Sequence, residues 1–211
     1  MEKAQLGRPR AFDADAALGQ AMLVFWRQGF EGASLADLTE AMGISRKSMY
    51  AAYGNKEELF RKVLQRYTDG PAAYIAEALS APTARETATA FLTGSIRANT
   101  MPGYPAGCLG VQGALAVGET GQVAHDILTE WRAVGQMHLR DRFRRAVREG
   151  DLPADADPDL IARYLMTIAN GLAVQASAGA GRQDLERVAG AALRNWPPRL
   201  TPDTIPAPAR H

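Results

Sequence analysis

The segment SRKSMYAAYG brings two basic side chains and two tyrosines together within eight residues. Arg46 and Lys47 come first, and Tyr50 and Tyr53 follow them along the chain. Guanidinium and ammonium groups donate hydrogen bonds to phosphates and to the edge of guanine, and a tyrosine hydroxyl can bond a phosphate. The sequence contains no nucleophile–base pair, metal-ligand set, phosphate loop or cofactor motif. It therefore favours binding over catalysis, and an enzyme with merely structural N-terminal helices is the least favoured alternative.

Short helices joined by a glycine turn are expected to position these side chains. Ser34 and Asp37 have the spacing of an approximate capping box, and Gly43 can adopt the left-handed conformation that ends a helix. Residues 13–53 therefore have the pattern helix, helix, glycine turn, helix, which is a helix-turn-helix within a three-helix unit. The predicted N-caps of the first four helices are Asp13, Ser34, Ser45 and Asn55.

Helical geometry divides the third of these helices into an inner and an outer face. Met49 and Tyr53 are four residues apart and are expected to pack on the first two helices. The other side chains face outward, as required of a helix that reads the major groove with its N-terminal residues. Helix starts also favour phosphate binding. The predicted DNA contacts are Ser34, Ser45, Arg46, Lys47, Tyr50, Ala51 and Lys56, with Arg8 and Arg10 of a basic arm reaching the backbone or minor groove.

Each of these assignments has a plainer alternative. Arg46 and Lys47 could form a solvated face of a helix with no partner, as basic pairs often do. For Tyr53 a role in the core alone is the better interpretation. The arm of residues 1–11 could be flexible without touching DNA.

The rest of the chain is also expected to be helical, which makes the fold class all-α. No run alternates with period two, and no stretch of about 18 apolar residues indicates a membrane span. The single cysteine cannot form a disulfide within the chain, and no secretory signal is present, so we expect a cytoplasmic protein. Further helices are predicted near 71–80, 83–99, 108–118, 121–149, 158–180 and 183–195.

Residues 10–66 resemble the DNA-binding domain of TetR-family transcriptional regulators. The similarity lies in the stretches GFEGASLADL, AMGISRKSMY and YGNKEELF. The segment YAAY departs from the family pattern, because many relatives carry histidine or tyrosine at Ala51 and Ala52 and phenylalanine at Tyr53. The resemblance implies an all-helical homodimer that binds double-stranded operator DNA. It also implies a C-terminal domain whose small-molecule ligand releases the DNA.

Four parts of the chain are expected on this basis. They are a flexible basic arm (1–11), a helix-turn-helix DNA-binding domain (12–68), a helical regulatory and dimerisation domain (69–196) and a disordered tail (197–211). Residues 160–176 are apolar nearly all round, so this helix must be covered on more than one side. The helices at 158–180 and 183–195 are therefore predicted to form the dimer interface, with a monomeric core as the alternative.

The ligand is expected to be a small apolar or amphipathic molecule, bound without a metal or cofactor. Aromatic and methionine side chains suit an apolar pocket, and amides could orient a ligand, although such residues are more often plain core. Cys108 begins a predicted helix, where its pKa can be lowered, so a thiol-based redox or electrophile switch is the alternative mechanism. A small buried hydrophobe is the plainer interpretation of Cys108. The predicted pocket residues are Phe91, Met101, Tyr104, Cys108, Gln112, Trp131 and Asn170.

Overall fold

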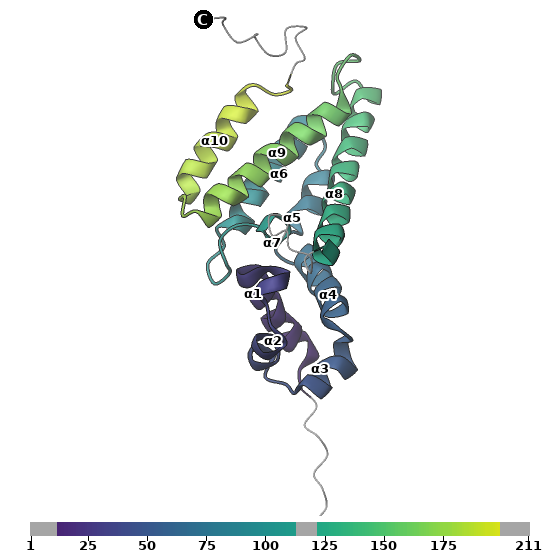
Figure 1. Ribbon diagram of the computed structural model, residues 1–211. Coiled ribbons are helices and arrows are strands. Elements are labelled where there is room, and N and C mark those ends of the chain that lie inside the picture. The colour runs from purple at the N-terminus through teal and green to yellow at the C-terminus, as the bar shows by residue number, and fades with distance from the viewer. Residues whose placement is uncertain (1–11, 113–121, 199–211) are drawn as a thin grey trace, which may run out of the picture.

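The computed structural model describes residues 12–112 and 122–198, and all regular structure within them is helical (Figure 1). This confirms the predicted all-α fold class. None of the described helices is long and apolar enough to cross a membrane. The helices are α1 (Ala14–Gly32), α2 (Leu35–Met42), α3 (Arg46–Tyr53), α4 (Lys56–Asp69), α5 (Tyr74–Leu79), α6 (Ala84–Asn99), α7 (Leu109–Gln112), α8 (Gln122–Arg148), α9 (Pro158–Ser177) and α10 (Arg182–Arg194).

The first four helices begin at the predicted caps. Asp13 accepts hydrogen bonds from two backbone N–H groups of α1, and Ser34 and Asn55 each complete a capping box at α2 and α4. Ser45 accepts from the backbone N–H of Ser48 at the start of α3. Gly43 ends α2 at φ 65°, a conformation in which a glycine has no Cβ to strain. These local signals fix the order helix, helix, turn, helix.

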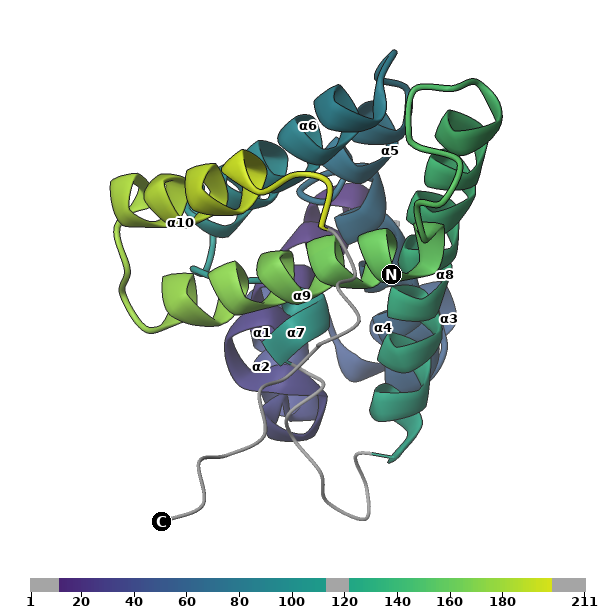
Figure 2. The same cartoon turned by 90° about the horizontal axis from the view of Figure 1, so that it is seen from above.

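Helices α1–α4 form one end of the molecule, and α8–α10 lie toward the other end (Figure 1). α4 runs from the first group to the second and packs against both α1 and α8. Viewed from above, α9 crosses the molecule beside α8, and α10 lies at the outer edge (Figure 2). α9 is held between α6 and α8, while α10 packs on α6 and α9.

Two apolar clusters make up the core. The first joins α1–α4 to the N-terminal half of α8, where Ile127 and Leu128 pack with it. The second is formed by α6, α9, α10 and the C-terminal half of α8. Helices α1–α4 therefore share their core with part of the C-terminal region. The domain boundary between residues 68 and 69 stays a prediction.

Candidate DNA-binding surface and effector cavity

The outer face of α3 presents its cationic side chains at the end of the molecule. Arg46, Lys47, Tyr50 and Ala51 are exposed, with Tyr50 48% accessible. Within the described residues no carboxylate lies within salt-bridge distance of Arg46 or Lys47. Both charges are therefore available to a partner outside the chain.

The inner face of α3 is fixed to the neighbouring helices. Met49 is fully buried and Tyr53 is 4% exposed. The Tyr53 hydroxyl donates a 2.6 Å hydrogen bond to the carbonyl of Ala14, and Lys62 donates to the carbonyl of Tyr53 at 3.2 Å. Tyr53 thus serves the core, as its plainer interpretation expected, and α3 is held rigidly on α1 and α4.

Ser34 and Ser45 are exposed at helix starts, but their hydroxyls already cap the helices. The Ser34 hydroxyl donates to the Asp37 carboxylate at 2.7 Å, and this bond is the largest cause of the lowered pKa of Asp37. The Ser45 hydroxyl lies 2.9 Å from that of Ser48. A phosphate at either place would meet a preorganised helix N-terminus rather than a free hydroxyl.

Lys56 is the first residue of α4 and is half-buried. Its ammonium lies 4.6 Å from the centre of the Phe30 ring, in the geometry of a cation–π contact. Burial lowers the pKa of Lys56, and the charge of Glu31 opposes this effect. Sequence reasoning placed Lys56 as a phosphate contact and did not foresee this packing. Arg8 and Arg10 lie outside the described residues.

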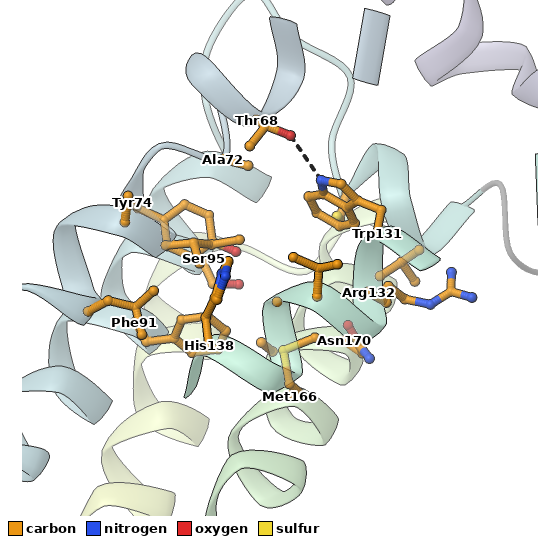
Figure 3. Close-up of a pocket in the computed structure, with 18 of the residues that line it drawn as sticks. Thr68, Ala72, Tyr74, Phe91, Ser95, Trp131, Arg132, His138, Met166 and Asn170 are labelled. Carbon is orange, nitrogen blue, oxygen red and sulfur yellow. Dashed lines mark hydrogen bonds between the residues drawn. The ribbon is translucent and has the colours of Figure 1, made fainter. Parts of the chain in front are cut away.

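A cavity of about 350 Å³ lies between α4 and the helices of the C-terminal region (Figure 3). Of the seven predicted pocket residues, four line it: Phe91, Cys108, Trp131 and Asn170. It is mostly apolar, as ligand cavities usually are. Its walls come from Cys108 and from α4, α5, α6, α7, α8 and α9, so a bound molecule would contact several helices.

The other three predicted pocket residues lie outside this lining. The ring of Tyr104 packs against Trp26 at 5.7 Å, and Tyr104 is 39% exposed. Gln112 turns back to donate to the carbonyl of Ala106 at 2.9 Å. Met101 follows the end of α6 and is only half-buried. All three belong to or contact the turn between α6 and α7, whose course could not be read from the sequence.

Several polar residues of the cavity were missed. Tyr74 of α5 and Ser95 and Asn99 of α6 line it together with His138 of α8. No group of three or more metal-ligating side chains exists among the described residues. The signal for Ser95 and Asn99 was their spacing of one turn, which places them on the same face of the helix as Phe91.

Cys108 lies in the cavity wall beside Tyr67. The Tyr67 hydroxyl donates to the Cys108 sulfur at 3.2 Å, and the backbone N–H groups of Gly110 and Val111 also face the thiol. Burial nevertheless raises the pKa of Cys108, and the hydrogen bonds and the charge of Arg132 oppose this only in part. The lowered pKa considered from its place at a helix start is therefore wrong. The resting form at neutral pH is the thiol.

Helices α9 and α10 carry apolar side chains that a single chain leaves uncovered. Val174 is 43% exposed and Val188 is 54% exposed. Tyr164 and Ile168 lie four residues apart on α9 and form a stripe that is only half-buried. A shallow groove along α10 is lined by Val188 and Ala191 together with the charged residues Asp184, Arg187 and Arg194.

Comparison with known proteins adds to this geometry. Residues 17–63 match the family described as "Bacterial regulatory proteins, tetR family", and residues 84–192 match "Tetracyclin repressor-like, C-terminal domain". The chain is 35% identical over 198 residues to the HTH-type transcriptional repressor ComR of Escherichia coli, covering 92% of this chain and 94% of that protein. It is 32% identical to the uncharacterised HTH-type regulator YezE of Bacillus subtilis, covering 76% and 84%.

A solved structure is similar over nearly the whole chain. It holds a cysteine-substituted variant of the regulator CifR, complexed with 26-base-pair double-strand operator DNA. The identity is 43%, the TM-score is 0.85, and the similarity covers 90% of this chain and 100% of that one. Together with the exposed basic face of α3, these similarities point to the same class of molecule.

Proposed function

The chain belongs to the TetR family of transcriptional regulators and is a DNA-binding regulator, and on this premise we propose a ligand-released repressor. It binds a pseudo-palindromic operator as a homodimer and leaves it when a small apolar or amphipathic molecule fills the cavity. The observation that carries the proposal is the exposure of Arg46 and Lys47 on a packed α3, where no described carboxylate pairs with them.

The proposed DNA contacts divide into two kinds. Arg46 and Lys47 read base edges in the major groove, where guanine O6 and N7 accept hydrogen bonds from basic side chains. Ala51 touches a thymine methyl group. Tyr50, Lys56 and the starts of α2 and α3 at Ser34 and Ser45 bind phosphates and set the register. Arg8 and Arg10 would add contacts to the backbone or the minor groove.

The homodimer is proposed to form through α9 and α10. Exposed Val174 and Val188 and the half-buried stripe of α9 support this interface, since contiguous apolar surface on a folded chain usually has a partner. Two chains related by a twofold axis would place two α3 helices against one face of DNA. Half-sites about 34–36 Å apart, or a multiple of this, would follow.

A series of aromatic ring contacts supports coupling between the cavity and the DNA-binding helices. Trp131 of the cavity wall lies 5.9 Å from Tyr67 of α4, and Tyr67 lies edge-on to Trp26 of α1 at 4.9 Å. Trp131 also donates to Thr68 of α4 at 2.9 Å (Figure 3). An occupant that displaces Trp131 would therefore act on α4 and α1 together, and so on the orientation of α3.

A thiol switch at Cys108 is the second candidate mechanism. This mechanism is supported by the position of Cys108 in the cavity wall. Its sulfur accepts a hydrogen bond from Tyr67, whose ring contacts Trp26. An electrophile in the cavity would form a covalent bond to the sulfur as the thiol loses its proton to solvent, and the added group would disturb the hydrogen bond from Tyr67. The raised pKa of Cys108 argues against a resting thiolate and makes the reversible ligand the first choice.

The test measures operator binding by fluorescence anisotropy while compounds that bind the cavity are added. The expected result is release of the DNA, with the compound binding the DNA-bound protein more weakly by the same factor. Cavity binding that leaves operator affinity unchanged would contradict the proposal. The variant Cys108→Ser separates the mechanisms, because release that survives it excludes the thiol switch.

A further inference from the structure

We propose that the cavity selects a small neutral molecule with one hydrogen-bonding head group, held by Tyr74, Ser95 and Asn99. The inference deepens the proposed function and rests on it only for the cavity's role as an effector site. It concerns which molecules the cavity accepts, which can be measured without DNA.

The polar wall is built from buried groups on α5 and α6. Ser95 is 2% exposed and Asn99 is 3% exposed, and the Asn99 amide donates to the Ser95 hydroxyl at 3.2 Å. Burial raises the pKa of Tyr74, and the hydrogen bond between Tyr74 and Ser95 opposes this in part. Tyr74 therefore keeps its proton and can donate to a ligand.

Bonding capacity is left over on this wall. Among the described residues, the side-chain amide oxygen of Asn99 accepts no hydrogen bond. The Tyr74 hydroxyl, which can both donate and accept, is paired with Ser95 alone. The Asn99 amide oxygen and the Tyr74 hydroxyl are not fully buried, so both can be reached from the cavity. A head group that both donates and accepts, such as a hydroxyl, satisfies both.

The charges of the lining exclude ionic head groups. No Asp or Glu lines the cavity within the described residues, so a cation would find no counter-ion. The guanidinium of Arg132 is engaged, donating to the Gly110 carbonyl at 2.7 Å and to Thr129 at 3.0 Å. It also points away from Tyr74 and Ser95 (Figure 3). A buried anion would meet no permanent positive charge at Tyr74, Ser95 and Asn99, which is unfavourable, and His138 would have to take up a proton to offset it.

The opposite side of the cavity suits an apolar body. Trp131 lies across the cavity from Tyr74 and Ser95, and Met166 lies on a further wall (Figure 3). Val111 and Ala169 also contribute apolar lining. A volume of about 350 Å³ is near the lower end for ligand cavities, which fits a body of one or two rings.

The test compares four probes that share one body and differ in head group. They are 4-tert-butylphenol, tert-butylbenzene, 4-tert-butylbenzoate and 4-tert-butylbenzylammonium, each titrated calorimetrically into the full-length protein at neutral pH. We expect the phenol to bind about tenfold more tightly than the hydrocarbon, as the loss of one buried hydrogen bond implies, and the two ions to bind more weakly still. The inference is overturned if either ion binds most tightly or if none of the four binds.

Two variants localise the head group. Ser95→Ala should lower the affinity for the phenol about tenfold and leave that for tert-butylbenzene unchanged. Met166→Leu, on the apolar side, should change the affinities for both by a similar factor. Circular dichroism confirms that each variant is folded. A phenol preference that survives both Ser95→Ala and Tyr74→Phe would contradict the assignment.

The same probes separate this inference from the proposed function. Selective binding of the phenol without any effect on operator affinity would sustain the head-group assignment and contradict ligand release. If the phenol and an ion released the DNA equally, ligand release would be sustained and the head-group assignment would be contradicted.

Discussion

At the scale of single residues, the exposed side chains of α3 and α4 should contribute to DNA binding in two separable ways. Arg46 and Lys47 lie on the outer face of α3, and no described carboxylate forms a salt bridge with either. Lys56 is the first residue of α4, and its ammonium contacts the ring of Phe30. The first two are placed for base edges and the third for a phosphate. Variants at these positions should therefore differ in kind as well as in size.

Arg46→Ala or Lys47→Ala should relax base preference at about one position of each half-site, at about 1–3 kcal/mol if the contact is bidentate. Lys56→Ala should weaken binding to all sequences alike and lower the slope of log K against log salt by about one. Binding to operator and to scrambled DNA over a salt series measures both effects. A change of base preference in Lys56→Ala would contradict this division, and thermal unfolding controls for the lost contact with Phe30.

The thiol of Cys108 should react slowly at neutral pH. Burial raises its folded pKa above that of the unfolded chain, so its contribution to stability is present below about pH 8.5 and is lost as pH rises through the folded pKa. Alkylation by iodoacetamide reports this thiol alone, because the sequence has one cysteine. We expect the rate to rise at higher pH than for a cysteine peptide, and Tyr67→Phe to move it higher. A rate that is already maximal at neutral pH would favour the thiol switch.

At the scale of elements, the DNA-binding helices could be predicted from the sequence and the cavity only in part. The starts of α1–α4 depend on residues within three positions of one another, such as Ser34 with Asp37, so local chemistry determines them. The cavity depends on how distant helices pack. Tyr74 and His138 are brought to it from α5 and α8, and no spacing in the sequence indicates this.

The turn between α2 and α3 should be sensitive to its glycine. Gly43 lies at φ 65°, and no atom outside its neighbours lies within 4 Å of the position its Cβ would take. Gly43→Ala should therefore lower the free energy of unfolding by about 1 kcal/mol through backbone strain alone. Gly135→Ala, at a helical glycine with equal space, should instead raise it by about 0.5–1 kcal/mol. Denaturant unfolding measures both, and a loss of stability in both variants would show that contacts rather than backbone conformation decide.

At the scale of the whole molecule, α4 connects the end that is proposed to bind DNA with the end that is proposed to form the dimer. The proposed interface at α9 and α10 would set the distance between two α3 helices, and the cavity lies between these ends. The apolar character of α9 was visible in the sequence because residues 160–176 are apolar nearly all round. Which residues of α9 stay uncovered, such as Val174, became visible only when α6 and α8 were placed around it.

The proposed dimer should dissociate when a charge is placed on its apolar face. Val174→Glu should shift the protein to a monomer in sedimentation velocity, because the carboxylate would have to be buried against the partner. Operator affinity should fall with it, since each monomer holds only one half-site. Val123→Glu changes a similarly exposed valine on α8 and should leave both properties unchanged. A dimer that persists in Val174→Glu would place the interface elsewhere.

The most direct test of the central claim is selection of bound sites from a random pool of DNA duplexes at fixed moderate salt. The purified full-length protein is compared with a variant carrying both Arg46→Ala and Lys47→Ala. We predict that the protein enriches a pseudo-palindrome with half-sites one helical turn, or a multiple of it, apart, and that the variant does not. Enrichment of the same sequence by the variant, or no enrichment by either protein, would contradict the claim that α3 reads an operator.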